Sequence, residues 1–128
     1  MRAEFILPWS PSTNNLRGGN RFGHSYPKKG YTDWKKTAGE ELDRLCMLEE
    51  PYEGRVSVTV RCYPPNKRPY DVDNRLKAVL DLLEKRVIVN DDQVDRCIGL
   101  RGHVHKGGAV WVLITPAEDY EPCPELPV

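Results

Sequence analysis

The chain has 128 residues and a formal net charge of zero, because 19 lysines and arginines balance 19 aspartates and glutamates. This length fits one domain with a modest core, and no apolar run approaches the ~20 residues that a membrane-spanning helix needs. The N-terminus lacks an apolar stretch of signal-peptide length, so we expect a protein of the cytoplasm.

The spacing of the cysteines and histidines limits which kinds of metal site we expect. Without a CxxC pair the cysteines predict no zinc site, and in the cytoplasm a disulfide is disfavoured. His103 and His105 alternate near the end of a strand and are expected at the surface. We expect four free thiols, three of them buried and the last one in a C-terminal tail: Cys46, Cys62, Cys97 and Cys123.

Charge is distributed unevenly along the chain, although the total is zero. Residues 1–36 hold seven basic and two acidic side chains, whereas residues 118–128 hold four acids and no base. A local basic surface suits a polyanionic partner such as nucleic acid. A solvated surface without any partner explains the same charges.

The first part of the chain predicts a strand, a long loop and a helix. Residues 3–7 form a short strand that Pro8 stops, and residues 8–15 a stiff turn rich in proline, serine and asparagine. Residues 16–30 predict a long polar loop, whose basic and aromatic side chains suit a phosphate backbone and its bases as well as plain solvent. A helix is expected to run from Thr32 or Asp33 to about Glu49, with one apolar stripe at helical spacing: Trp34, Ala38, Leu42 and Leu45.

The second part predicts a strand, a helix and two more strands. Residues 56–62 alternate apolar and polar side chains, which is typical of a half-buried strand, and a helix should run from about Asp73 to Lys85. Residues 94–100 predict a strand, and a turn at 106–108 predicts a hairpin into the last strand, 109–115.

This order of elements, β-α-β-α-β-β, predicts a single α+β domain over residues 1–116, with a small mixed β-sheet and two helices packed on it. Residues 117–128 form an acidic, proline-rich tail that we expect to be disordered.

Two acidic clusters flank the second predicted helix. Asp71 and Asp73 stand at its start, Lys77 lies one turn further on, and Asp91-Asp92 follows it. The alternation of an extended segment would point Asp71 and Asp73 the same way, and Asp91 or Asp92 is expected to join them. Carboxylates are the ligands that Mg²⁺ and Mn²⁺ prefer, and such ions catalyse phosphodiester hydrolysis. Lys77 would offset negative charge on the reacting phosphate.

Plainer interpretations of these residues stay open. Asp71 suits an Asx turn, Asp73 suits a helix cap, and an Asp pair suits an ordinary polar turn. Lys77 suits a helical ion pair with Asp73. An EF-hand loop from Asp71 is excluded, since Leu76 and Leu82 stand where that loop needs glycine and glutamate.

Two stretches taken together resemble a known family. Residues 7–15 (Leu-Pro-Trp-Ser-Pro-Ser-Thr-Asn-Asn) are similar to the N-terminal signature of the RusA family of Holliday-junction resolvases. Residues 71–77 (Asp-Val-Asp-Asn-Arg-Leu-Lys), followed by residues 90–94 (Asn-Asp-Asp-Gln-Val), resemble the family's catalytic core. The likeness spans most of residues 4–115, with these stretches in the family's order and spacing.

The resemblance implies a homodimeric endonuclease that depends on Mg²⁺, with Mn²⁺ as a substitute, and that cuts four-way DNA junctions by paired nicks in recombination and repair. By position, Asp71, Asp73 and Lys77 match the family's essential acids and lysine. Counting forward from Lys77 makes Asp92 the third acid. Counting back from Gln93 makes it Asp91, because the family usually has one residue between the Asp pair and that glutamine, and this chain has none. We favour Asp91 and keep both as candidates. Such enzymes are often encoded by phages and prophages, which fits a small bacterial protein of the cytoplasm.

The DNA contacts are expected from basic and amide side chains around these acids, which would hold backbone phosphates. The candidates are Asn14, Asn15, Arg17, Arg21, Lys28, Lys29, Lys67, Arg68 and Asn74. Two alternatives are a DNA-binding protein of the same fold without catalysis, and a less selective nuclease that acts on flaps or forks.

Overall fold

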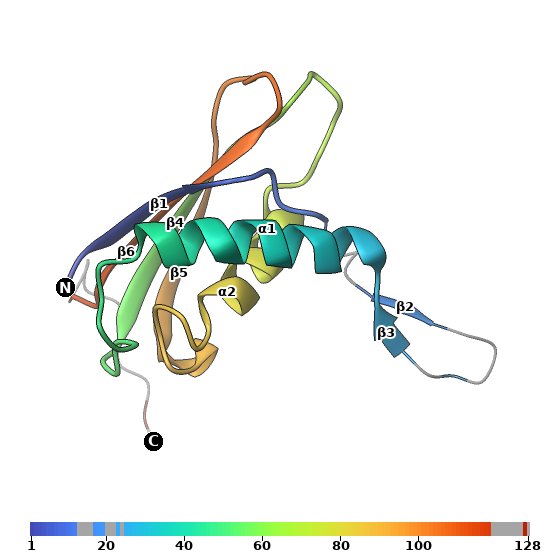
Figure 1. Cartoon of the computed structure of the whole chain (residues 1–128). Coiled ribbons are helices and arrows are strands. Elements are labelled where there is room, and N and C mark those ends of the chain that lie inside the picture. Colours follow the sequence, from blue (N-terminus) through green and yellow to red (C-terminus); the bar gives the residue numbers. More distant parts are fainter. Residues whose placement is uncertain (13–16, 20–22, 24, 119–126, 128) are drawn as a thin grey trace.

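Four strands form a mixed sheet, and two helices cover one of its faces (Figure 1). The computed structural model describes residues 1–12, 17–19, 23, 25–118 and 127. The strand order is β1 (Ala3–Leu7), β6 (Ala109–Pro116), β4 (Val56–Tyr63) and β5 (Val94–Arg101). Strand β5 is parallel to β4, and the other neighbours are antiparallel. The predicted α+β domain with a mixed sheet and two helices is therefore confirmed.

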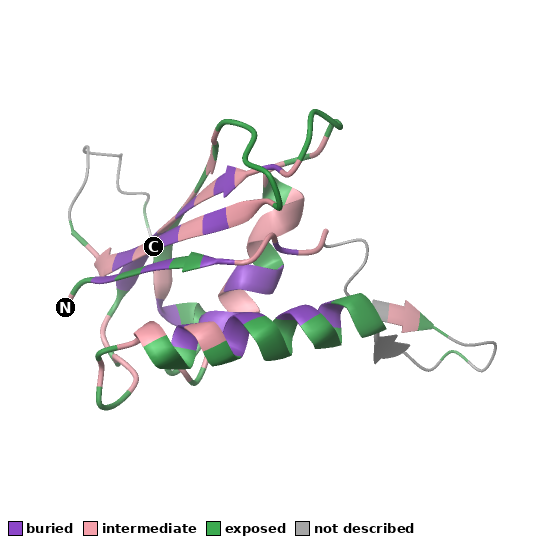
Figure 2. Cartoon of the chain, turned by 45° about the horizontal axis from the view of Figure 1, so that its top comes forward, coloured by how far each residue is buried: buried purple, intermediate pink, exposed green. Residues whose placement is uncertain are grey.

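Alternation along the strands separates an inner face from an outer face. Phe5, Val112 and Val60 lie in one row across β1, β6 and β4, and all three are buried under the helices. The neighbouring row points outward, and there Ile6 is 65% exposed. Figure 2 shows the resulting stripes of buried and less buried residues along the strands. Only one face of the sheet needs a cover, because the apolar side chains gather on that face.

Helix α1 (Lys29–Leu45) lies on the inner face and covers β1. Trp34, Ala38 and Leu42 are buried as the helical spacing predicts. The predicted start at Thr32 or Asp33 is wrong, because the helix begins one turn earlier, after an extended Lys28 that makes no side-chain cap. The predicted end is also too late, since the chain is already extended at Cys46.

Helix α2 (Leu76–Leu83) is preceded by a 3₁₀ turn, η2 (Asp73–Arg75). The predicted helix continued to Lys85. It ends earlier because Lys85 has a φ of 68° and its amide bonds the carbonyl of Ile88 at 2.7 Å. This reversal buries Ile88 and the preceding Val87 completely.

The predicted hairpin between the last two strands is wrong. The turn exists, with Gly107 and Gly108 at φ values of 85° and 71°, where glycine is favoured. However, β5 and β6 lie on opposite sides of β4, so the turn belongs to a connection that crosses the end of β4. Along this connection, the amide of Gly102 bonds the carbonyl of Cys62, and that of His105 bonds the carbonyl of Pro64.

The long polar loop predicted over residues 16–30 is partly wrong as well. Strands β2 (Arg17–Gly19) and β3 (Ser25–Pro27) pair antiparallel and form a separate small ribbon before α1 (Figure 1). The predicted disordered tail lies outside the described residues, apart from its first two residues and residue 127. Within the described part of the chain, no helix has the length and apolar content to cross a membrane.

The described thiols are free, but one of them is placed differently from the prediction. Cys62 is buried and Cys46 is partly buried, whereas Cys97 is exposed. Cys97 is exposed because β5 is an edge strand at the border of the helical layer. Cys123 lies outside the described residues. His103 and His105 are exposed, as expected.

Candidate functional site

The first acidic cluster lies in a tight turn rather than in an extended segment. Asp71 and Asp73 are both exposed. Val72 between them has helical dihedral angles of −60° and −44°. Alternation therefore does not apply, and the expectation that both carboxylates point the same way by strand geometry is wrong. The side-chain amide of Asn74 donates a hydrogen bond to Asp71 Oδ2 at 3.2 Å, which fixes the Asp71 carboxylate relative to η2.

Contacts from distant parts of the chain hold this turn in place. Arg75 Nη1 donates to the carbonyl of Ser10 at 2.7 Å, and Ser10 Oγ donates to the carbonyl of Arg75 at 3.2 Å. On the other side, Val72 packs on Gly99 of β5, where a Cβ would come within 2.7 Å of Val72 Cγ1. The N-terminal signature thus has a structural role, because it anchors the segment that carries Asp71 and Asp73.

Lys77 is exposed one turn after Asp73, on the face that the helical spacing predicts. Its Nζ lies 3.6 Å from Asp81 Oδ1. Lys77 therefore pairs with Asp81 and not with Asp73, which was the plainer alternative. Asp81 also accepts a hydrogen bond from the Tyr31 hydroxyl at 3.3 Å, which ties this face of α2 to α1. An exposed pair of this kind adds little stability, so Lys77 remains available to a phosphate.

The second acidic cluster is a 3₁₀ turn, η3 (Asp91–Gln93), with a capping box. The Asn90 side chain accepts from the amide of Asp92 at 3.1 Å, and Gln93 Oε1 accepts from the amide of Asn90 at 2.8 Å. Gln93 is buried and donates to the carbonyls of Tyr52 and Gly54. Asn90 and Gln93 therefore build a rigid support that leaves both aspartates exposed to solvent.

The two acidic clusters lie at opposite ends of α2. Asp73 begins the turn before this helix, whereas the Asp91 amide bonds Glu84, which follows it. The eight residues of α2 alone span about 12 Å. Strand β5 separates the two clusters by a similar length. The second cluster lies directly before Val94, whereas Val72 of the first cluster packs on Gly99, and the stretch from Val94 to Gly99 spans about 16 Å.

The expected convergence of three carboxylates is therefore wrong for a single chain. Among the described residues, no three histidine, cysteine, aspartate or glutamate side chains come together as a metal-holding group. The carboxylates have the right chemistry for Mg²⁺, but those of one chain do not form a complete ligand set.

The structure describes only some of the predicted DNA contacts. Lys67 and Arg68 are exposed on the connection from β4 to η2, and Lys28 and Lys29 are exposed at the start of α1. For Arg17, only the backbone is described. Asn14, Asn15 and Arg21 lie outside the described residues.

An aromatic and cationic stack beside Asp71 was missed by the analysis of the sequence. Trp9 and Tyr70 meet edge to face, with ring centroids 5.3 Å apart. The guanidinium of Arg75 lies 4.8 Å from the Trp9 ring centroid, and that of Arg101 lies 4.2 Å from the Tyr70 centroid. Contacts between residues so far apart in the chain leave no local pattern, so the sequence held no signal for them.

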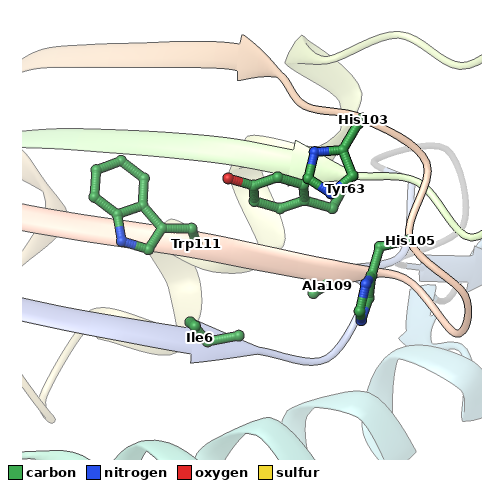
Figure 3. Close-up of a pocket in the computed structure, with 6 residues that line it drawn as sticks. All are labelled: Ile6, Tyr63, His103, His105, Ala109 and Trp111. Atoms are coloured by element: carbon green, nitrogen blue, oxygen red, sulfur yellow. The ribbon is translucent and has the colours of Figure 1, made fainter.

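The outer face of the sheet carries a separate hollow of about 230 Å³ at the same end as the connection from β5 to β6 (Figure 3). Its lining side chains are Ile6, Tyr63, His103, His105, Ala109 and Trp111. The Tyr63 and His103 rings meet edge to face at 5.0 Å, and Trp111 Nε1 donates to Glu4 Oε1 at 2.7 Å. None of the four candidate aspartates is among the described residues that line this hollow, so it is distinct from the candidate site.

Comparison with known proteins decides the family. Residues 8–114 match the family model described as Endodeoxyribonuclease RusA. The chain belongs to this family. A crossover junction endodeoxyribonuclease RusA of Escherichia coli strain K12 is 31% identical over 110 residues, which cover 85% of this chain and 90% of that protein.

Phage proteins with the same name are similar to the chain as well. The one from Enterobacteria phage HK97 is 29% identical over 118 residues, covering 90% of this chain and 95% of the relative. The one from Enterobacteria phage 82 is 31% identical over 110 residues, covering 85% and 90%. The resemblance seen in residues 7–15, 71–77 and 90–94 is confirmed at the level of the family.

Proposed function

We propose that this RusA-family endonuclease cuts four-way DNA junctions by paired nicks during recombination and repair, and that cleavage depends on Mg²⁺. The family match over residues 8–114 carries this proposal. Asp71, Asp73 and Lys77 support it together with Lys67 and Arg68 on the preceding connection, because these acidic and basic groups are exposed and lie within eleven residues of the chain.

The separation of the acidic clusters bears on how many chains make one site. Asp71 and Asp73 stand at one end of β5 and α2, and Asp91 and Asp92 at the other end. In a homodimer with a twofold axis across the middle of β5, the first cluster of one copy would face the second cluster of its partner. We propose that the working enzyme is such a dimer and that each site takes acids from both copies.

Two features of the β5 side of the molecule support this interface. Strand β5 is an edge strand, and among the described residues its outer side has no strand partner. It contains neither proline nor lysine, although Asp95, Arg96 and Arg101 place charges along it. Beside it, Val72, Leu76 and Leu80 form an apolar stripe that is only partly buried. A second copy paired along β5 would satisfy the free backbone groups and cover this stripe.

The residues of this chain have definable tasks in the proposed reaction. Asp71 and Asp73 of one copy, with Asp91 or Asp92 of the other, would hold the divalent ion, which would supply an activated water and stabilise charge on phosphoryl oxygens. Lys77 would offset negative charge on the scissile phosphate, exchanging its weak contact with Asp81 for that phosphate. Lys67 and Arg68 would hold backbone phosphates, so recognition would rest on the shape of the junction more than on base edges.

The direct test is cleavage of a synthetic four-way junction by Asp73→Asn. We expect the variant to lose Mg²⁺-dependent cleavage and to bind the junction as well as the parent does. Asp33→Asn, an exposed aspartate on α1 outside the site, is the matched control and should cleave normally. Cleavage by Asp73→Asn at the parent rate would contradict the role of this acid. If the parent protein cleaves junction, fork and linear duplex equally, the less selective nuclease is favoured. If the parent protein binds the junction without cleaving it, the non-catalytic DNA-binding protein is favoured.

Mixing two inactive variants tests the shared site. One copy would carry Asp73→Asn, and the other would carry both Asp91→Asn and Asp92→Asn. If each site uses acids from both copies, a mixed dimer keeps one intact site and nicks one strand of the junction. If each site lies within one chain, every site in the mixture is defective and no nicks appear.

A further inference from the structure

A small cavity opens beside the first acidic cluster, between the end of β1, the connection after β4 and η2. Its volume is about 180 Å³, and it is lined by Trp9, Tyr70, Arg68, Arg75 and three prolines together with Asn66. Because a water molecule in the liquid takes about 30 Å³, this space has room for several waters or for a flat ring. None of the described residues that line the cavity is acidic. Tyr70 directly precedes Asp71, so the cavity adjoins the proposed cleavage site.

Arg75 is the unusual residue in this cavity. Its buried Nε atom has no hydrogen-bond partner among the described residues, and its Nη1 donates to the carbonyl of Ser10. Among the described residues, other arginines such as Arg44 and Arg55 pair with acids, and Arg75 does not. A partly desolvated cation without an anion is costly unless a ligand supplies the negative charge.

The remaining walls of the cavity suit the base of a nucleotide. Trp9, Tyr70 and the prolines give it apolar and aromatic surface beside the guanidinium. Aromatic side chains stack on nucleobases, and arginine pairs with phosphate through several donors in a fixed geometry. A paired base inside a duplex is not accessible to such a wall, whereas an unpaired base at a branch point is accessible.

We propose that this cavity receives one unpaired nucleotide at the branch of the DNA, with its phosphate at Arg75 and Arg68 and its base against Trp9 and Tyr70. The proposal rests on the proposed function, since it places that nucleotide next to the strand to be cut. It assigns to Arg75 a contact that a linear duplex would not use.

The test compares Arg75→Met with the parent protein on a four-way junction and on a linear duplex of matched length. Methionine keeps apolar packing against Trp9 but removes the charge. We expect roughly tenfold weaker junction binding, as for the loss of one charged contact, and a salt dependence reduced by about one phosphate contact. Duplex binding should not change. Arg44→Met, on the exposed face of α1, is the control and should leave both affinities unchanged. Unchanged junction binding by Arg75→Met, or an equal loss on both DNAs, overturns the proposal.

A second measurement on the unaltered protein does not depend on the folding of a variant. A junction with 5-bromouracil at the branch is crosslinked by ultraviolet light, and the attached residue is identified by mass spectrometry. We expect attachment at Trp9 or Tyr70, and attachment only elsewhere overturns the proposal.

The two proposals fail in different ways. If the parent binds but never cleaves the junction, while the crosslink forms at Trp9 or Tyr70, the nuclease function fails and the nucleotide cavity stands. If the parent cleaves, while Arg75→Met binds the junction as tightly as the parent, the cavity proposal fails alone.

Discussion

Gln93 is the side chain on which the second acidic cluster depends. It makes three hydrogen bonds, to the carbonyls of Tyr52 and Gly54 and to the amide of Asn90, at 2.7, 2.8 and 2.8 Å. Gln93→Ala removes all three and leaves those backbone groups without this partner. At about 1 kcal/mol for each bond, the variant should lose about 3 kcal/mol of unfolding free energy. In a chain of this size that lowers the melting temperature by roughly 10 °C.

The assay is urea unfolding followed by tryptophan fluorescence, with junction cleavage measured at a temperature where the variant remains folded. Because Gln93 supports the turn that presents Asp91 and Asp92, we expect cleavage to fall even in the folded variant. Glu49→Ala, an exposed change outside any element, controls for the effect of substitution itself. A loss of unfolding free energy well below 1 kcal/mol would refute the view that these hydrogen bonds hold the turn.

Three further predictions follow from packing and titration. Gly99→Val should destabilise the protein by about 1–3 kcal/mol, because the new side chain meets Val72, and adding Val72→Ala should recover part of that loss in the same unfolding assay. Leu82→Ala should cost about 3 kcal/mol, since Leu82 is fully buried under the sheet, and a loss under 1 kcal/mol would mean that the site is not tightly packed. Burial raises the pKa of the Cys62 thiol, so the folded state holds this proton more tightly than the unfolded state does. Unfolding free energy should therefore be highest below about pH 8.5 and fall at higher pH, and Cys62→Ala should flatten that slope. The same burial means that iodoacetamide should modify Cys62 only in denaturant, as mass spectrometry would show.

Local patterns predicted the elements well wherever one element has one buried face. The stripe of Trp34, Ala38 and Leu42 and the alternation in residues 56–62 both reflect contact with a single core, which imposes a period on the chain. The ends of the helices were less predictable. The late start predicted for α1 assumed a side-chain cap, and the late end predicted for α2 overlooked the reversal at Lys85.

The sequence by itself determined the α+β class, the order of the main elements, the family and the residues that carry the candidate chemistry, because each of these depends on residue types and short spacings. Only the tertiary structure decided that β5 and β6 lie on either side of β4, and that Asp71 and Asp73 stand far from Asp91 and Asp92. It also decided that Arg75 is enclosed beside Trp9 without an acidic partner among the described residues. These relations join residues that are distant in the chain, and they follow from which strand edges pair and which faces pack, for which no local pattern exists.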